Sequence, residues 1–402
     1  MKNKAPAIIS IFSFCIILFF GMISYVTAKP SSFSEEENRA LATMPRFSGK
    51  SWREGKFTRR MDSYFSDNVT LRPQLVRASG LSSSAIFCGF SRGVCASADG
   101  QLAVCRFDAY LSPTKRVTDT DFFSECHIRE QCEAIKHLAD DLSASEIPLC
   151  FLPAPRTIDG CAPWSIYPQE PSDKLDSIIN SCLSDKENLT LINVLPVLRS
   201  AYADGEYVIF RTDHHWTADG AYKAYLEIME NLFSNITPLK KSDFSIRQID
   251  GFVGTTASRA CVSNTPLCRA DTLEIWECYD DKSFVITDNN GFEMRGFIDE
   301  KFLSTKDKYG AYLSGTRNFL EIYKTDGNGE KIPNRPRLLI AKDSFANNVI
   351  PLLARHFDLT VVNLSGGMTD ISDHAKKHDV NAVIILYNRE NMICADYLNR
   401  VK

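Results

Sequence analysis

The chain alternates short apolar runs with longer amphipathic stretches. Short apolar runs bounded by polar residues indicate buried strands, and apolar residues recurring every three or four positions indicate helices. In the stretch 217–233, for example, Ala221, Tyr225 and Ile228 share one face, and Thr217 or Asp219 can cap the start. Alternation of this kind predicts an α/β fold with a mainly parallel sheet and helices on both of its faces. The predicted strands are 148–153, 189–194, 337–341, 359–364 and 382–387, and the predicted helices are 120–142, 196–202, 217–233, 345–357 and 370–377.

One long segment breaks this alternation. Residues 240–335 are rich in Gly, Asp, Asn and Thr and contain strand-like pieces such as 283–287. We interpret the segment as a β-rich insertion near the rim of the site, inside a main domain that spans 81–402.

The N-terminus begins with an uninterrupted apolar run. No charged residue occurs between Ala7 and Ala28, and Lys2 and Lys4 precede the run. Its length matches the roughly 20 residues that cross a bilayer as a helix, and lysines ahead of it predict an exported remainder. Because 26–28 also resembles a signal-peptidase site, residues 1–28 are either a signal anchor in the cell membrane or a signal peptide whose cleavage secretes the protein. A signal core of about 7–15 residues is shorter than this run, which favours the anchor.

Residues 29–80 are predicted to form a juxtamembrane linker followed by an amphipathic helix. Phe57, Met61, Tyr64 and Phe65 recur at helical spacing, with charged residues between them. This face can pack on the main body or bind a membrane surface, and the mixed signs of the intervening charges favour packing.

Composition adds two restrictions. The 402 residues are 44% hydrophobic and carry a net charge of −4, which is typical of a globular protein and gives no basic excess for binding nucleic acid. Thirteen cysteines are many, and in an exported domain they favour some disulfides. The absence of any Cys-x-x-Cys pair argues against a zinc ribbon.

The candidate chemistry lies in two separated motifs. Asp213 and His215 are two residues apart in the run 211–217, so a carboxylate can hold an imidazole with little intervening chain. Ser344 follows the predicted strand 337–341 and precedes the predicted helix 345–357. A serine at such a junction lies at the carboxyl edge of the sheet, and the helix start behind it supplies amide donors for an oxyanion. Together the three residues are the parts of a hydrolase triad, with Ser344 as nucleophile, His215 as base and Asp213 as its orienter.

The order of these residues restricts the fold. They run Asp, His, Ser along the chain, whereas α/β-hydrolases run Ser, Asp or Glu, His. Ser344 also lacks the Gly-x-Ser-x-Gly elbow of that fold.

The blocks 212–217 and 342–346 resemble the DHHW family of exported bacterial proteins, which are similar to periplasmic alginate O-acetylation proteins with an SGNH-hydrolase-like domain. Weaker likenesses are 37–41, 65–67 with Arg72, and 251–255. The resemblance implies a flavodoxin-like three-layer fold that is circularly permuted relative to ordinary SGNH hydrolases. It also implies the triad roles given above, with Trp216 as a packing or substrate-facing aromatic residue. Many SGNH members carry glycine two residues before the serine, where this chain has Lys342.

Other site assignments and alternatives stay open. Asn388 is one candidate oxyanion donor, and Gly315 and Asn318 are others. Arg156 follows a predicted strand and is either a substrate-anion ligand or an ordinary surface arginine. We predict no metal and no cofactor, although Asp213, His214 and His215 could instead be metal ligands, His215 could be a buried histidine without chemistry, and Asp343-Ser344 could be a plain helix cap.

The resemblance implies an extracytoplasmic O-acetyltransferase or carbohydrate esterase that acts on a cell-envelope polysaccharide. Its implied partner is a membrane-bound O-acyltransferase that supplies the acyl group. A catalytically silent envelope scaffold or glycan-binding module is the alternative from another class.

Overall fold

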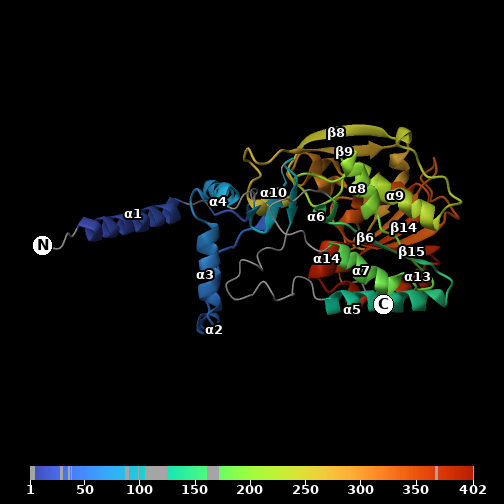
Figure 1. Ribbon diagram of the computed structural model, residues 1–402, viewed down its shortest axis with the longest axis horizontal. Coiled ribbons are helices and arrows are strands. Elements are labelled where there is room, and N and C mark those ends of the chain that lie inside the picture. The colour runs from blue at the N-terminus through green and yellow to red at the C-terminus, as the bar shows by residue number, and fades with distance from the viewer. Residues whose placement is uncertain are drawn as a thin grey trace. The chain divides into compact units, whose positions relative to one another are not determined.

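The computed structural model describes the chain in two compact units, and Figure 1 shows its helices and strands. One unit comprises residues up to 92 together with 257–268, and the other comprises 93–256 and 269–402. The described residues are 5–27, 30–34, 37, 39–86, 90–97, 99–104, 125–160, 172–366 and 370–401. The lysines before the apolar run, Ala28 and the start of the predicted helix 120–142 lie outside them.

The first unit is mainly helical. Among the residues that the structure describes, no helix is long and apolar enough to cross a membrane, so the N-terminal anchor stays a prediction from the sequence. The elements of this unit are α1 (Ala5–Thr27), β1 (Phe33–Ser34), β2 (Arg39–Ala40), α2 (Gly49–Arg53), α3 (Lys56–Asp67), α4 (Arg72–Ile86) and β3 (Phe90–Ser91).

Two sequence segments with a weak likeness to the DHHW family, the one that begins at Glu37 and the one that ends at Asp67, are joined by ion pairs in this unit. The Arg39 guanidinium binds both carboxylate oxygens of Asp67, at 3.0 and 2.6 Å, and the Ala42 amide donates to the same carboxylate. Arg72 binds Glu37 at 2.5 Å. The hydrogen bond from Arg39 helps to lower the pKa of Asp67. Glu37, Arg39, Asp67 and Arg72 therefore form one charged network that ties the β1–β2 segment to α3 and α4.

The second unit is built on one large mixed sheet. Its eight strands lie in the order β11-β10-β12-β14-β13-β15-β6-β7. β14, β13, β15, β6 and β7 are parallel to one another, whereas β12, β10 and β11 continue the sheet in antiparallel fashion. The strands are β6 (Leu149–Ala154), β7 (Leu189–Leu191), β10 (Phe284–Thr287), β11 (Glu293–Arg295), β12 (Phe319–Lys324), β13 (Arg337–Lys342), β14 (Asp358–Asn363) and β15 (Ala382–Asn388).

Helices cover both faces of the sheet (Figure 1). Alternate side chains of the central strands, among them Leu339 and Ile385, form one apolar core with α5, α7, α13 and α14. α8 and α9 lie over the opposite face. The helices of this unit are α5 (Glu125–Ser143), α6 (Thr157–Gly160), α7 (Ser172–Leu183), α8 (Leu195–Ala203), α9 (Ala218–Leu232), α11 (Glu300–Leu303), α12 (Ile350–Ala354), α13 (Ile371–Lys377) and α14 (Arg389–Cys394). The chain passes from the second unit into the first within α10 (Thr255–Ala260). In the second unit, β4 (Val94–Ala96) also pairs with β5 (Leu102–Val104), and β8 (Ser245–Phe252) pairs with β9 (Asp271–Glu277).

The five strands β14, β13, β15, β6 and β7 are parallel, as expected, and β12, β10 and β11 of the segment 240–335 extend the sheet in antiparallel fashion beyond β14, so the whole sheet is mixed. One expectation about this fold is corrected. The predicted helix 345–357 is broken into a 3-10 helix over Ser344–Asn348 and the short α12. Pro351 lies in the first turn of α12 and lacks an amide proton, so a continuous helix would lose a hydrogen bond there.

Candidate active site

A tight hairpin-like turn carries Asp213 and His215. Ile209 and Trp216 form an isolated antiparallel bridge, and the Thr217 amide donates to the Val208 carbonyl. The residues between them form a short, largely buried loop. Thr217 then caps α9 by accepting from the Gly220 amide, which confirms one of the two predicted caps.

Asp213 is held on both carboxylate oxygens. Oδ1 accepts from the His215 amide at 3.1 Å and lies 2.5 Å from His215 Nδ1. Oδ2 accepts from the amide and the hydroxyl of Thr255, at 2.8 and 2.9 Å. Burial alone would raise the pKa of Asp213, but the neighbouring charges of His214 and His215 and these hydrogen bonds hold its pKa far below the usual range. Asp213 is therefore an ionised acceptor at neutral pH.

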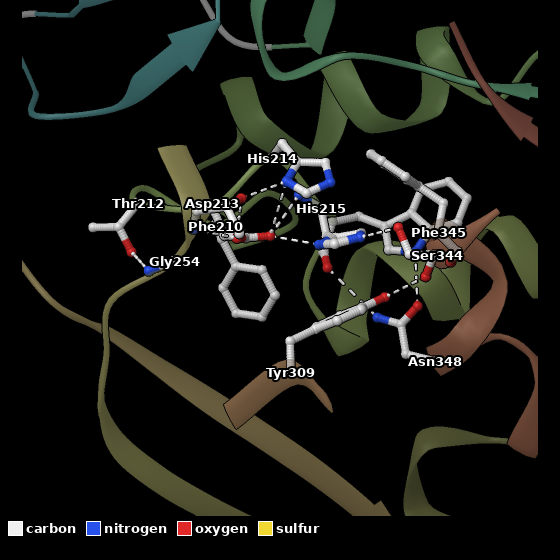
Figure 2. A network of polar contacts seen from close by, with 12 residues as sticks. Phe210, Thr212, Asp213, His214, His215, Gly254, Tyr309, Ser344, Phe345 and Asn348 are labelled. Carbon is white, nitrogen blue, oxygen red and sulfur yellow. Dashed lines mark hydrogen bonds and ion pairs between the residues drawn. The ribbon is translucent and has the colours of Figure 1, made fainter. Parts of the chain in front are cut away.

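Gly254 allows this approach to Asp213. A Cβ on Gly254 would lie 2.3 Å from the Cβ of Asp213. Any residue other than glycine would therefore clash with Asp213 at this position. The Gly254 amide donates to Thr212 Oγ1 at 3.0 Å (Figure 2). In the segment 251–255, Gly254 thus packs against Asp213, and Thr255 provides the two donors to Asp213 Oδ2.

Ser344 completes the triad from the end of β13. Its Oγ lies 2.7 Å from His215 Nε2, and Figure 2 shows the three side chains in line. Because Asp213 accepts only, Nδ1 of His215 carries the proton and Nε2 accepts from the serine hydroxyl. Asp213 and His215 are buried, whereas Ser344 is half-buried. The structure thus brings together the three residues that the sequence predicts.

The turn that carries Ser344 is fixed by its two preceding residues. The Asp343 carboxylate accepts from the Phe345 amide (3.0 Å), the Asn388 amide (2.7 Å) and Asn391 Nδ2 (2.8 Å). Lys342 is fully buried, and its ammonium group donates to Asn347 Oδ1 at 2.5 Å. Burial lowers the pKa of Lys342 to about 8. The side chain of Lys342 therefore reaches into the 3-10 helix that begins at Ser344.

An aromatic side chain that the sequence did not indicate covers His215. The ring of Tyr309 stacks on the imidazole with centroids 4.0 Å apart and an angle of 11° between planes. Its hydroxyl donates to the Ser344 carbonyl at 3.0 Å (Figure 2). Burial raises the pKa of Tyr309 well above its ordinary value, so the hydroxyl stays protonated. No local pattern marks Tyr309, because its role depends on the packing of the segment 240–335 against the triad.

The three predicted substrate-binding residues have different surroundings. Trp216 is 1% exposed, and its Nε1 donates to the Phe345 carbonyl and Asn348 Oδ1, which favours packing over a substrate-facing role. Arg156 is buried rather than on the surface, and Asp159 binds it at 3.0 and 2.7 Å. Asn388 lies at the same sheet edge as Ser344, where its Oδ1 caps α14. Substrate contacts for Arg156 and Asn388 stay predictions. Oxyanion donation by Gly315, Asn318 or Asn388 stays a prediction as well.

Among the residues that the structure describes, two groups of side chains have the residue types of metal ligands. In Asp213, His214 and His215, both nitrogens of His215 are already in hydrogen bonds, and His214 Nδ1 lies 2.7 Å from Thr255 Oγ1. In Glu321, His374 and His378, the two imidazoles stack at 4.2 Å with an angle of 23°. Imidazole binds metals in its ring plane, and nearly parallel planes do not converge on one ion.

The model of the DHHW protein family matches residues 170–363 of this chain, and it confirms the resemblance found in the sequence. None of the curated proteins matches the chain significantly. The fold is similar to a DHHW family protein from Eubacterium siraeum, with 18% identity, a TM-score of 0.57 and coverage of 68% of this chain and 87% of that one.

It is also similar to PatB1 from Bacillus cereus, with 19% identity, a TM-score of 0.56 and coverage of 70% and 94%. A structure of PatB1 with a sulfonyl adduct matches with 17% identity, a TM-score of 0.57 and coverage of 77% and 100%. These likenesses support a mixed α/β fold around a large mixed sheet.

Proposed function

We propose, from the premise that this chain is a DHHW family protein over residues 170–363, that it transfers acyl groups through Ser344, His215 and Asp213. One observation carries the proposal. His215 lies 2.7 Å from Ser344 Oγ and 2.5 Å from Asp213 Oδ1, which is the hydrogen-bonded relay that activates a serine nucleophile.

The proposed reaction has two halves that use the same residues. Ser344 Oγ attacks the acyl carbonyl carbon while its proton passes to His215 Nε2. The tetrahedral intermediate collapses, the leaving group takes that proton, and the acyl group remains on the serine as an ester. An acceptor hydroxyl then gives its proton to His215 Nε2 and attacks this ester. The second tetrahedral intermediate breaks its bond to Ser344 Oγ, which takes the proton back from His215, so the product ester is released and Ser344 is restored. Asp213 stabilises the imidazolium in both halves.

The proposed substrates follow from the family resemblance. The acyl group is acetyl, and the acceptor is a sugar hydroxyl of a cell-envelope polysaccharide outside the cytoplasm. A membrane-bound O-acyltransferase would supply the acetyl group, and the N-terminal helix would hold the protein at the cell membrane. When water replaces the sugar hydroxyl, the same steps make the protein a carbohydrate esterase.

The test uses an activated acetyl ester such as p-nitrophenyl acetate, with and without oligosaccharide acceptors. We expect Ser344→Ala and His215→Ala to abolish turnover, and Ser184→Ala, at an exposed serine, to leave it unchanged. Acetylated acceptor would identify a transferase, and release of acetate alone an esterase. Equal rates in all four proteins would remove Ser344 and His215 from this chemistry and favour a silent scaffold or glycan-binding module.

A further inference from the structure

The first unit exposes an aromatic cluster, which we define as Phe47, Trp52 and Phe57. The three rings lie 5.2 to 6.2 Å apart between centroids. Gly55, with φ of +67°, forms the left-handed turn between α2 and α3 that brings them together. Phe47 and Trp52 are nevertheless 68% and 56% exposed. The rings pack on one another and still present a large apolar surface to solvent.

The helix that carries the cluster has its packing surface elsewhere. Tyr64 and Asp67, in the second half of α3, are its buried residues. Met44, just before the cluster, is 56% exposed and adds to the same apolar segment. Exposed aromatic side chains in such a group are unfavourable in water and typical of a binding surface.

Cations surround the aromatic cluster. The segment 44–62 contains two carboxylates, Glu54 and Asp62, against six basic residues: Arg46, Lys50, Arg53, Lys56, Arg59 and Arg60. All six basic residues are exposed, and Lys56 pairs with Glu54 at 2.7 Å. The segment thus has a net positive charge, although the whole chain has a net charge of −4.

The combination distinguishes between two kinds of partner. Protein–protein interfaces are enriched in arginine, methionine and aromatic residues, but they are depleted in lysine and their centres are depleted in charged residues. A segment with six exposed cations and a net positive charge fits such a centre poorly. Exposed tryptophan and phenylalanine among lysine and arginine are instead the composition of a segment that lies in the headgroup region of a bilayer. Anionic lipids attract such cations, and the aromatic rings enter the interface.

We propose that residues 44–62 dock on an anionic lipid surface, with the aromatic cluster inserted at headgroup depth and the six cations at the lipid phosphates. This goes beyond the proposed acyl transfer and is independent of it. It favours the membrane-surface alternative for the amphipathic helix over packing on the main body.

The test is fluorescence quenching of Trp52 by brominated lipids. The full chain is added to vesicles of phosphatidylethanolamine and brominated phosphatidylglycerol, and the emission of the wild type is compared with that of Trp52→Phe. We expect the wild type to be strongly quenched and Trp52→Phe to lose most of the quenching. Trp276→Phe, at a tryptophan of β9 in the second unit, is the matched control and should keep the quenching.

The charge requirement is tested on the same signal. Brominated phosphatidylcholine in place of the anionic lipid should quench Trp52 much less. Each of Lys50→Glu and Arg59→Glu should raise the anionic-lipid concentration that half-quenches Trp52 by at least roughly fivefold. Tyr279→Ser, at a fully exposed tyrosine of the other unit, should leave this concentration unchanged. Unquenched Trp52 in anionic vesicles, or equal quenching in both lipids, would overturn the proposal. Trp52 that is also shielded from aqueous acrylamide without lipid would show that protein covers the cluster, and would overturn it as well.

Discussion

At the scale of single residues, the triad is supported by neighbours that belong to another part of the chain. Asp213 receives two hydrogen bonds from Thr255, and His215 lies against the ring of Tyr309. These contacts matter for chemistry because the imidazole must keep one tautomer and one orientation while its charge changes. Tyr309 contributes an aromatic face, which attracts a cation such as imidazolium, and a hydroxyl that fixes the Ser344 carbonyl.

The two contributions of Tyr309 can be separated by substitution. Tyr309→Phe keeps the stacked ring and loses one hydrogen bond, so kcat for acetyl-ester turnover should fall by about tenfold or less. Tyr309→Leu loses the aromatic face as well, and kcat should fall further, by roughly 10- to 100-fold. Both are measured with p-nitrophenyl acetate.

Tyr312→Leu is the matched control for Tyr309→Leu. Tyr312 is buried in the same apolar cluster and donates to the Glu274 carbonyl. Its replacement should lower stability similarly and change kcat much less. Equal losses of kcat in the two leucine variants would mean that Tyr309 acts only through folding.

At the scale of elements, β13 ends in a buried lysine, Lys342, two residues before Ser344. The ammonium group of Lys342 binds Asn347 within the 3-10 helix. Burial favours the neutral amine, which is why the pKa of Lys342 is about 8 in the folded chain. The ordinary value of 10.5 applies when the chain unfolds.

This difference predicts a pH dependence of stability. Between about pH 8 and 10.5 the unfolded chain holds a proton on Lys342 that the folded chain has lost, so raising the pH stabilises the folded state. Below pH 8 both states are charged and the penalty of burial is constant. Lys342→Met has no such group, so the unfolding free energy of the wild type should rise relative to this variant by at most about 3 kcal/mol.

Urea titrations at pH 7.5, 9 and 10.5 measure this change. Other titrating groups are common to both proteins and cancel in the comparison. Parallel pH profiles for wild type and Lys342→Met would show that Lys342 is not desolvated in the folded chain.

The apolar runs of the sequence predict individual elements well where burial on both faces determines the pattern. Leu338 to Ala341 and Val383 to Leu386 are buried on both sides and form β13 and β15 as expected. The apolar spacing of 345–357 is helical throughout and predicts one continuous helix after Ser344. Pro351 interrupts this helix, because proline lacks the amide proton that a helix interior needs for its hydrogen bond.

At the scale of the whole molecule, the segment 240–335 contributes three strands, β10, β11 and β12, to the main sheet. β12 pairs with β14 on one side and with β10 on the other. The sequence predicts a strand at 283–287. It does not predict that this strand pairs with β12, because strand pairing depends on residues distant in the chain. The Asp, His and Ser of the site could be identified from their motifs, whereas Thr255 and Tyr309 became part of it only through this packing.

The position of β12 inside the sheet predicts a difference between two proline substitutions. Ile322 is buried and lies opposite Leu359 of β14 and Ile286 of β10. Ile322→Pro would disrupt an interior strand, and should lower the midpoint of thermal unfolding strongly or prevent soluble expression. Met294→Pro affects the edge strand β11 and should have a smaller effect.

Thermal unfolding followed by circular dichroism compares the two variants. A small effect of Ile322→Pro would mean that β10, β11 and β12 are not integral to the sheet and can detach while the parallel strands remain folded.

The contacts of Thr255 and Tyr309 also restrict how this protein can be recombined with its relatives. Both residues lie between His215 and Ser344 in the chain, and each touches the triad from the intervening segment. A chimera that exchanges this segment alone would combine His215 and Ser344 of one parent with the residues of the other parent at the positions of Thr255 and Tyr309. Productive crossovers therefore fall before Asp213 or after Ser344, so that the segment is inherited together with the triad it completes.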